Sequence, residues 1–321
     1  MLAVFASSTN ADDPLSALEV GERPDPEPPD GWATVTVKAA SLNHHDLWSL
    51  RGVGRPDERL PMILGCDAAG VDEDGNEVIV HSVIASDGWR GDETLDPKRS
   101  LLSERHQGAL AEKVAVPTGN LVPKPQALSF EDACCLPTAW LTAYRMLFVK
   151  SGLQPGQTVL IQGAGGGVAS AAIVLARQAG LRVWVTSRDA ARGEKAKELG
   201  AHDAFESGAR LPERVDAVLE TVGEATWKHS LRALRPGGTL VVSGSTSGAN
   251  PPADLQRVFF LQLNVIGSTM GTRDELRQLA RLCETSGVRP QIDRVLPLSE
   301  ARDGFAALDA GDVFGKIVFT P

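Results

Sequence analysis

The segment from Val159 to Ala169 constrains the fold more than any other part of the chain. It runs from an apolar strand through a glycine-rich turn into the start of a helix. Such a turn leaves bare backbone N–H groups at a helix N-terminus, where a pyrophosphate can approach closely. No reading frame completes G-x-G-x-x-G, so a tight turn without a ligand is the alternative. The residues expected to contact a dinucleotide here are Gly163, Gly165, Gly166, Gly167 and Val168.

The surrounding sequence predicts a doubly wound parallel sheet. From Phe130 onwards, apolar strands alternate with helices, which is typical of a sheet covered on both faces. Ser129 precedes an acidic first turn and predicts the cap of the first long helix, which continues in pieces to about Lys150. We expect strands at 158–162, 182–187, 215–220, 239–243 and 264–267, with helices at 169–179 and 192–199.

Residues up to about 123 have a different rhythm and predict a small β barrel. Short alternating strands are expected at 2–6, 15–21, 32–39, 77–82 and 111–117. A helix over 274–283 and a strand over 315–319 are expected to return to this domain. The predicted fold class is therefore α/β, with a parallel-sheet nucleotide-binding domain over 124–267 and a barrel domain over 1–123 and 268–321.

Composition excludes several classes of protein. A formal net charge of -9 argues against nucleic-acid binding, which needs a concentrated basic face. No run of about 18 apolar residues predicts a membrane span, so we expect no membrane partner and a cytoplasmic protein. Short-chain reductases need a lysine four residues after their catalytic tyrosine. Tyr144 is the single tyrosine here and Phe148 follows it at that spacing, so the sequence excludes this class. No CxxC pair indicates a disulfide framework or zinc finger among Cys66, Cys134, Cys135 and Cys283.

The end of the second strand bears on which dinucleotide would bind. NAD-preferring folds usually place an acidic residue there to bond the ribose 2′-hydroxyl. Here the strand ends in Ser187 and Arg188, and Arg192 follows one helical turn later. A hydroxyl and guanidinium groups suit a 2′-phosphate, so the pattern favours NADP over NAD. The alternative is that both arginines are solvated surface charges, with Asp189 weakening their field.

Seven ordered segments resemble one enzyme superfamily across nearly the whole chain. They are 41–46 (SLNHHD), 61–70 (PMILGCDAAG), 141–144 (LTAY), 163–168 (GAGGGV), 220–223 (ETVG), 235–238 (RPGG) and 314–316 (FGK). Together they resemble the medium-chain dehydrogenase/reductase superfamily, in particular its quinone-oxidoreductase-like and zinc-type alcohol dehydrogenase-like members. The resemblance implies a GroES-like catalytic barrel built from both chain ends, with the nucleotide-binding domain inserted between them.

The resemblance also locates the positions at which zinc-containing members hold their metal. These positions carry Asn43, Cys66 and Thr138 here, and only the cysteine is a good zinc ligand. The stretch 83–106, where a structural zinc lobe would lie, contains no cysteine. We therefore expect no metal. A rival set of His44, His45, Cys66 and Asp67 matches no ordinary ligand spacing.

Without a Lewis acid, hydride transfer favours an acceptor that spreads the incoming charge itself. Quinones and α,β-unsaturated carbonyls do so, which predicts an NADPH-dependent, zinc-independent reductase of these compounds. The alternatives are a zinc-dependent alcohol dehydrogenase and a non-catalytic NADPH-binding redox sensor.

Four residues are the candidate catalytic groups. His45 stands where zinc-containing relatives carry a proton-relay hydroxyl, so it is the candidate proton donor, or simply a histidine at a helix start. Asn43 is a candidate to bond the substrate or the nicotinamide ribose, or to cap the helix that follows. Asp67 orients neighbours, and Thr142 resembles the family residue near the nicotinamide or packs a helix.

Further cofactor contacts follow from the resemblance and from the position of a loop after the fourth strand. That loop lies at the carboxyl end of the sheet, where ligands bind. The residues are Ser243, Gly244, Ser245, Met270 and Lys316, with a hinge or strand-end role as the alternative. The apolar stretch 258–266 lies near the sheet edge and predicts a homodimer, although core burial would also explain its composition.

Overall fold

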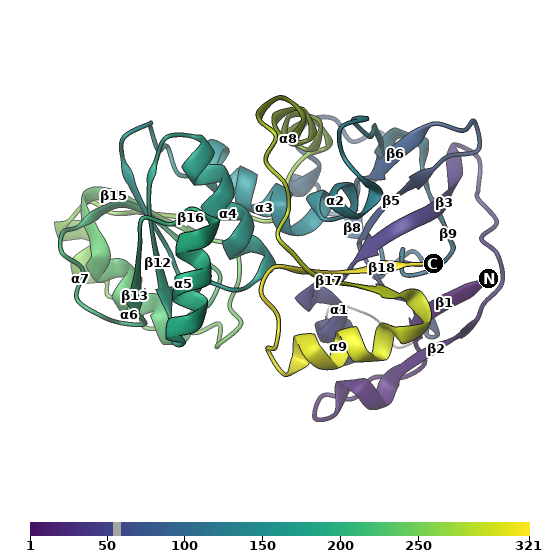
Figure 1. The fold of residues 1–321 in the computed structure, drawn as a ribbon, viewed down its shortest axis with the longest axis horizontal. Coiled ribbons are helices and arrows are strands. Elements are labelled where there is room, and N and C mark those ends of the chain that lie inside the picture. The colour runs from purple at the N-terminus through teal and green to yellow at the C-terminus, as the bar shows by residue number, and fades with distance from the viewer. Residues whose placement is uncertain (54–58) are drawn as a thin grey trace. The chain divides into compact units, whose positions relative to one another are not determined.

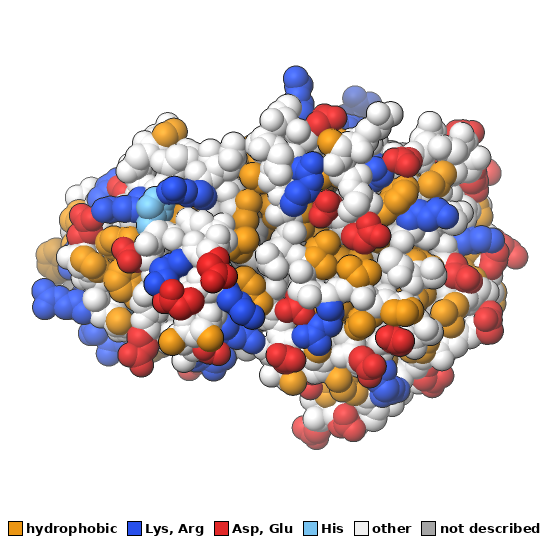
Figure 2. Space-filling model, viewed as in Figure 1, with side chains coloured by type: hydrophobic (Ala, Val, Ile, Leu, Met, Phe, Trp, Pro, Cys, Tyr) orange, Lys and Arg blue, Asp and Glu red, His pale blue; other side chains and the backbone are white. Residues whose placement is uncertain are grey.

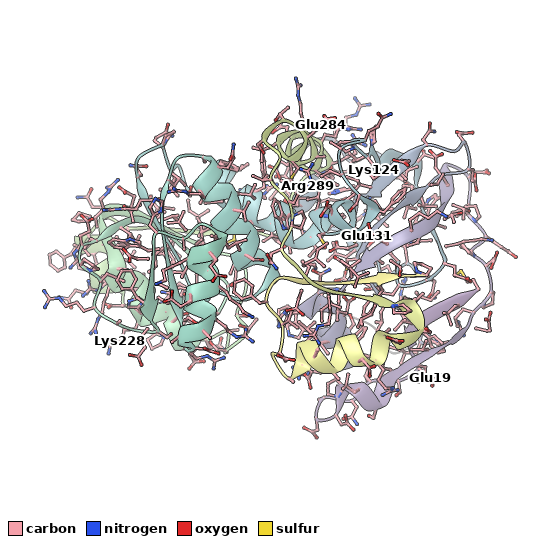
Figure 3. All side chains as sticks on the ribbon, viewed as in Figure 1. Glu19, Lys124, Glu131, Lys228, Glu284 and Arg289 are labelled. Carbon is pink, nitrogen blue, oxygen red and sulfur yellow. The ribbon has the colours of Figure 1, made fainter. Side chains whose placement is uncertain are left out.

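The computed structural model describes residues 1–53 and 59–321 (Figure 1). The chain divides into two compact units, one of Met1–Leu141 with Met270–Pro321 and the other of Thr142–Thr269. Residues 124–141 therefore group with the first unit, and the C-terminal segment returns to it. Arg289 joins these parts, because its guanidinium donates to the Ala127 carbonyl at 2.8 Å and lies 3.7 Å from Asp132 (Figure 3).

The first unit is built on mainly antiparallel sheets made from both chain ends, with one parallel pair, β17 and β18. A small sheet has the order β2-β1-β4, and a larger one has the order β10-β6-β5-β3-β18-β17 with β9 paired to β3. The C-terminal strand β18 pairs with β3, with Val318 opposite Ser41. The strands are β1 (Leu2–Ala6), β2 (Leu18–Glu22), β3 (Trp32–Ser41), β4 (Met62–Ile63), β5 (Asp67–Val71), β6 (Glu77–Val80), β7 (Val83–Ile84), β8 (Ser100–Leu101), β9 (Lys113–Pro117), β10 (Leu121–Pro123), β17 (Ile292–Pro297) and β18 (Lys316–Thr320).

Helices cover this barrel, and its core is aliphatic and aromatic. The helices are α1 (His44–Leu50), α2 (Phe130–Cys134), α8 (Arg273–Ser286) and α9 (Ala301–Asp309). Phe305 of α9 stacks on Phe319 of β18 with ring centroids 6.4 Å apart, and both are fully buried. One expected strand starts late: residues 14–17 form a 3₁₀ turn that begins at Pro14, whose fixed φ suits a first helical position, so β2 starts at Leu18.

The second unit is a six-stranded parallel sheet with helices between its strands. The strand order is β13-β12-β11-β14-β15-β16. Successive strands are added on one side of β11 up to β13 and then on its other side from β14 onwards, which defines a doubly wound sheet. The α/β fold class is thus confirmed. Its elements are α3 (Leu141–Tyr144), β11 (Thr158–Ile161), α4 (Gly167–Gln178), β12 (Arg182–Ser187), α5 (Ala190–Leu199), β13 (Asp203–Glu206), β14 (Val215–Glu220), α6 (Glu224–Ala233), β15 (Leu234–Val242), α7 (Leu255–Phe260) and β16 (Asn264–Gly267).

The surface carries charges of both signs. On the face drawn in Figure 2, Lys and Arg side chains lie among Asp and Glu side chains, with apolar groups between them. Within residues 1–53 and 59–321, no helix has both the length and the apolar character needed to cross a membrane.

Candidate functional site

In the first unit, the start of α1 is fixed to the segment before β5 by one buried carboxylate. Asp46 is fully buried, and its Oδ2 accepts the Asn43 backbone N–H at 2.9 Å. Its Oδ1 accepts the Gly65 backbone N–H, also at 2.9 Å. Asn43 is the N-cap residue of α1 and has extended backbone angles. Asp46 therefore fixes the distance between Asn43, at the start of α1, and Gly65, just before Cys66 and Asp67.

A second buried carboxylate, Asp67 at the start of β5, collects hydrogen bonds from three side chains. Its Oδ2 accepts the Ser41 hydroxyl and the Asn43 amide, each at 2.8 Å. Its Oδ1 accepts the Thr138 hydroxyl at 2.5 Å. Asp67 is 0% exposed, and a buried carboxylate requires such donors and a nearby cation.

That cation is Lys316 at the start of β18. Its ammonium lies 3.6 Å from Asp67 Oδ2 and donates to the Leu42 carbonyl and to Asn43 Oδ1, both at 2.6 Å. Lys316 is buried. Both ends of the Asn43 amide are therefore engaged within the protein, one by Asp67 and the other by Lys316. This network brings together Asn43, Asp67 and Lys316 from three distant parts of the chain.

His45 lies between a thiol and a carboxylate. Its Nδ1 is 3.3 Å from Cys66 Sγ, and its Nε2 is 3.2 Å from Glu104 Oε1. Burial lowers the pKa of His45, but Cys66 and Glu104 outweigh burial and raise its pKa well above 6.5. The Cys66 thiol donates to the Leu102 carbonyl at 3.3 Å, and burial raises its pKa. The raised pKa favours the protonated imidazole, which is the form a proton donor needs.

Ser103, next to Glu104, is strained into the left-handed region. It has φ 65° and is fully buried, which a residue other than glycine adopts only when its surroundings enforce it. The Ser82 carbonyl accepts the Leu102 backbone N–H, and the Ser82 hydroxyl donates to the Cys66 carbonyl. One buried serine therefore anchors both the turn that carries Glu104 and the strand start that carries Cys66.

In the second unit, the glycine-rich loop presents open backbone. Gly163 has φ 84°, a left-handed conformation that favours glycine. Gly166 caps α4 without any side-chain hydrogen bond, and a Cβ built on it would meet nothing within 4 Å. The first N–H groups of α4 have no helical partner, so they can bind an anion. Gly165, Gly167 and Val168 complete the same turn and helix start.

The end of β12 carries the residues expected to distinguish NADP from NAD. Asp189 caps α5, because its Oδ1 accepts the Ala191 backbone N–H at 2.8 Å. The Ser187 hydroxyl donates to the Asp189 carbonyl. Arg188 is exposed, whereas Arg192 lies 4.0 Å from the Asp189 carboxylate. Asp189, the acidic residue of this turn, therefore serves as a helix cap, and the Arg188 guanidinium is exposed to solvent.

The loop after β15 is packed closely against the loop after β14. A Cβ on Gly244 would lie 2.8 Å from the Thr221 carbonyl oxygen, so this position requires glycine. Ser243 donates its backbone N–H to the Glu220 carbonyl at 2.9 Å. Ser245 lies beside Gly223, where an added Cβ would come within 2.9 Å of the Ser245 Cα. The loop 243–248 is thus held at the carboxyl end of the sheet.

The two remaining candidates lie in different units. Thr142 is buried in α3 and belongs to the second unit, whereas Met270 is buried in the first and has φ 47°.

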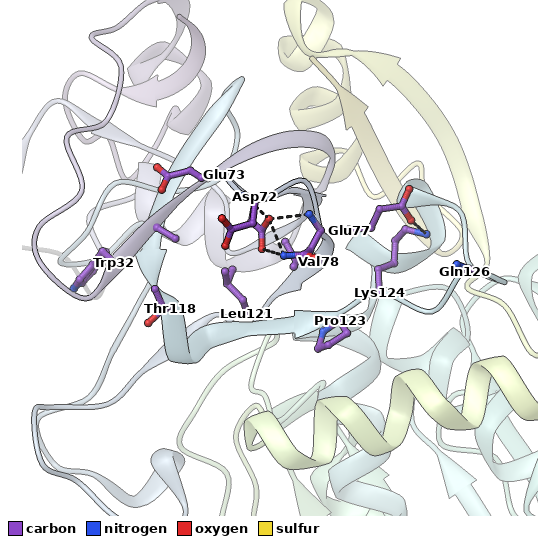
Figure 4. A pocket seen from close by; sticks show the side chains of 13 residues that line it. Trp32, Asp72, Glu73, Glu77, Val78, Thr118, Leu121, Pro123, Lys124 and Gln126 are labelled. Atoms are coloured by element: carbon purple, nitrogen blue, oxygen red, sulfur yellow. Dashed lines mark hydrogen bonds and ion pairs between the residues drawn. The ribbon is translucent and has the colours of Figure 1, made fainter.

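A groove of about 670 Å³ in the first unit contains none of the candidate site residues (Figure 4). Its acidic turn is satisfied internally, because Asp72 accepts both the backbone and the side-chain N–H groups of Asn76.

Comparison with known proteins agrees with this architecture. Residues 29–126 match the alcohol dehydrogenase GroES-like domain, and residues 167–285 match the zinc-binding dehydrogenase model. An acryloyl-coenzyme A reductase from Metallosphaera sedula is 29% identical over 94% of this chain and 96% of its own. A crystal structure of an NAD-dependent alcohol dehydrogenase is 33% identical, with a TM-score of 0.92 and full coverage of both chains. A 2-octenoyl-CoA carboxylase reductase, CinF, in complex with NADP and 2-octenoyl-CoA, is 25% identical with a TM-score of 0.90, covering 99% of this chain and 87% of that one.

A GroES-like barrel joined to a doubly wound sheet with an open glycine loop defines an oxidoreductase architecture. The chain belongs to the medium-chain dehydrogenase/reductase superfamily.

The residues present do not fit the zinc that the family name implies. At the three ligand positions, the Asn43 amide is held by Asp67 and Lys316, the Thr138 hydroxyl donates to Asp67, and only Cys66 offers a soft donor. Catalytic zinc normally has three protein ligands. Among the described residues, the metal-capable group is His45, Asp46 and Cys66, whose ligand atoms lie within 4.8 Å of one another. In that group both Asp46 oxygens already accept backbone N–H groups, which leaves two donors.

Sequence reasoning missed the residues that support these sites. Asp46 follows Asn43 by three positions, which is the spacing of a capping box and is a signal the sequence offered. Glu104 lies 59 residues from His45, and no local pattern connects them. Glu220 is fully buried, and its Oε1 accepts the Val222 and Gly223 backbone N–H groups. It supports a loop of the second unit through contacts that only the fold creates.

Proposed function

We propose that the protein is an NADPH-dependent reductase of activated carbon–carbon double bonds or quinones that works without a catalytic metal. The observation that carries this proposal is the network of Asn43, Asp67, Thr138 and Lys316. It engages two of the family's three metal-ligand positions, Asn43 and Thr138, in hydrogen bonds within the protein, and its own buried ammonium balances the carboxylate.

The second unit supports binding of a nicotinamide dinucleotide. The N–H groups around Gly166 would hold its pyrophosphate, and the loop 243–248 would lie near its nicotinamide half. Arg188, with Ser187 and Arg192, would hold the 2′-phosphate that distinguishes NADP. When bound, the reduced nicotinamide supplies a hydride.

An acceptor suited to this site delocalises the charge that the hydride brings. Quinones do so, and so do α,β-unsaturated carbonyls, a class that includes enoyl thioesters such as the substrates named for the acryloyl-CoA and octenoyl-CoA relatives. Reduction then needs one proton and no Lewis acid. His45, protonated between Cys66 and Glu104, is the residue we assign to donate it. Thr142 and Met270 are proposed to contact the nicotinamide.

A substrate panel tests the proposal. Consumption of NADPH with crotonyl-CoA, a simple enone and a quinone should exceed consumption with an unactivated ketone by at least about 100-fold, because only the first three carry an electron sink. Equal rates with the ketone would defeat the assignment of acceptor class. Tight NADPH binding with no turnover of any acceptor would favour the redox-sensor alternative.

Arg188→Ala tests the cofactor choice. We expect weaker NADP⁺ binding by about 10-fold with little change in NAD⁺ binding, since one charge-assisted hydrogen bond to phosphate is lost. Tryptophan fluorescence titration of both dinucleotides measures this. Lys228→Ala, an exposed cation of the same unit, is the matched control. Equal affinity of the wild type for both dinucleotides would contradict the NADP preference.

A zinc-dependent alcohol dehydrogenase is the second candidate, because Cys66 Sγ and His45 Nδ1 lie 3.3 Å apart and could share a cation. Metal analysis of the purified protein separates the two. One tightly bound zinc per chain, with alcohol oxidation as the preferred reaction, would favour this candidate.

We also propose a homodimer formed by the second unit. β16 is an edge strand of its sheet, and Phe259 and Phe260 just before it are 63% and 67% exposed. An unpaired edge flanked by exposed aromatic groups suits pairing with a second copy. Sedimentation of wild type and of Phe259→Asp/Phe260→Asp tests this: a dimer that dissociates supports it, and a monomeric wild type rejects it.

A further inference from the structure

The first glycine of the phosphate loop is tied to a chain of buried polar side chains behind it. The Gly163 N–H donates to the Thr186 hydroxyl at 3.2 Å, and that hydroxyl donates to Gln162 Oε1 at 2.6 Å. Gln162 and Thr186 are each 1% exposed. The position of the Gly163 backbone therefore depends on which way the Gln162 amide faces.

The other end of the Gln162 amide is fully occupied. Its Nε2 donates to His229 Nδ1 and to the Ser230 hydroxyl, each at 2.9 Å. Ser230 in turn donates to Glu220 Oε2 at 2.6 Å, so its oxygen can only accept from Gln162. Ser230 and Glu220 are fully buried. Every donor and acceptor of the Gln162 side chain has one partner of the right kind.

These contacts indicate which ring nitrogen of His229 carries a hydrogen. Its Nε2 lies 2.9 Å from the Ala209 carbonyl, which can only accept, so Nε2 carries a hydrogen. Its Nδ1 faces the Gln162 N–H, which can only donate, so Nδ1 carries none. These contacts therefore fit the Nε2–H tautomer of the imidazole. It is half-buried on α6 and can exchange a proton with solvent.

Protonation of His229 would place two N–H donors 2.9 Å apart. Turning the Gln162 amide by 180° would relieve that clash, but it would aim Nε2 at Thr186 and Oε1 at the lone pairs of Ser230. The charged group hydrogen-bonded into this network, among the described residues, is Glu220, which touches Gln162 through Ser230. Either response to protonation breaks at least one buried hydrogen bond behind the loop.

We propose that Gln162 and His229 are positioning residues for the dinucleotide, with neutral His229 keeping the phosphate loop in its binding conformation. The proposal rests on the proposed dinucleotide binding, and it assigns a role to two residues that do not contact the pyrophosphate themselves. It predicts that dinucleotide affinity falls when His229 takes up a proton.

Binding titrations of the full chain test this with NAD⁺ and NADP⁺ from pH 8 to pH 5.5. NAD⁺ has no 2′-phosphate, so its affinity reports the loop without that group's own titration. Wild-type affinity for NAD⁺ should fall by about 5- to 10-fold across this range, the size of one lost buried hydrogen bond. His229→Gln keeps an acceptor toward Gln162 and a donor toward Ala209, so it should bind equally at both ends of the range.

Two further variants sharpen the test. His202→Gln removes the other histidine described in this unit, whose Nδ1 accepts the Val183 N–H, and should retain the wild-type pH dependence. Gln162→Glu replaces the amide donor by a carboxylate that accepts from protonated His229. It should therefore weaken or reverse the fall in affinity. Retention of the wild-type fall in His229→Gln would overturn the proposal.

A readout independent of binding distinguishes this proposal from the proposed function. The Gly163 amide resonance should titrate together with the His229 ring in the free protein. If it does so while no dinucleotide binds at any pH, the coupling stands and the proposed function fails. If the Gly163 resonance does not follow His229, the positioning role is wrong even where dinucleotide binding is tight.

Discussion

The polar groups of the first unit and the glycine loop of the second unit are prepared for ligands in opposite ways. Around Asp67 the side chains of Asn43, Thr138 and Lys316 bind one another and are buried. At Gly166 the backbone faces open space and no side chain caps the helix. A closed side-chain network fixes geometry and charge in advance, whereas open backbone offers hydrogen bonds to an incoming anion. Changes in the first region should cost stability, and changes in the second should cost affinity.

Lys316→Met should give the largest effect. It leaves the fully buried Asp67 without its cation, which typically costs about 3–5 kcal/mol. Chemical denaturation measures the loss. Lys38→Met, an exposed position on β3, is the control, and Lys316→Met/Asp67→Asn should recover part of the loss. Wild-type stability of the single variant would show that the network is not closed as described.

His81 is an exception in the first unit, because among the described residues its buried ring nitrogens have no hydrogen-bond partner, and the Glu93 carboxylate lies 3.8 Å from Nε2. Burial, helped by Arg273 and Arg277, lowers its pKa to about 3. Between pH 6.5 and about 3 the unfolded chain binds the extra proton, so His81 should remove about 1.4 kcal/mol of stability per pH unit of acidification. His81→Leu should flatten the acid side of the stability profile. An unchanged slope would contradict the assignment.

Gly166→Val should separate affinity from stability in the second unit. Among the described residues, no atom lies within 4 Å of the added Cβ, so the melting temperature should shift little. It would occupy the space in front of the N–H groups, and NADP⁺ affinity should fall by at least about 10-fold. Gly152→Val, another open glycine of the unit, is a control for surface substitution, although its φ of 70° adds backbone strain. Unchanged affinity would remove the loop from the binding site.

Glu104→Gln should give a smaller, pH-dependent effect. His45 donates its proton in the proposed reaction, so the rate should fall as pH rises through the His45 pKa. Loss of the hydrogen bond to the Glu104 carboxylate should lower the His45 pKa and move this fall in rate to lower pH. Glu77→Gln, an exposed carboxylate paired with Lys124, should leave this fall in place. If the pH at which the rate falls is the same in Glu104→Gln and the wild type, His45 is not the group whose protonation limits the rate.

Local patterns predicted much of the fold. The strands 182–187, 215–220 and 264–267 match the observed strands residue for residue. The first two are largely buried, as parallel strands usually are, whereas 264–267 lies at the sheet edge and is mostly exposed. β13 was missed because it has only four residues, of which two are charged and none is fully buried. β17 was missed as well, since its charged residues obscure the alternation expected of a strand.

The candidate site was only partly accessible from sequence. The motif positions indicated Asn43, His45 and Asp67, but residue types alone left open whether Asn43 faces a ligand or the protein. Its partner Lys316 is 273 residues away, and Glu104 is 59 residues from His45. Long-range pairs of this kind are set by strand pairing, here β18 with β3, and carry no local signature.

In the proposed reaction the acceptor, and not a metal, stabilises the charge delivered by the hydride. The rate of crotonyl-CoA reduction by NADPH, measured together with the zinc content before and after chelator treatment, tests this. We expect much less than one zinc per chain and an unchanged rate after chelation. One zinc per chain, with a rate lost on its removal and restored by its return, would contradict it.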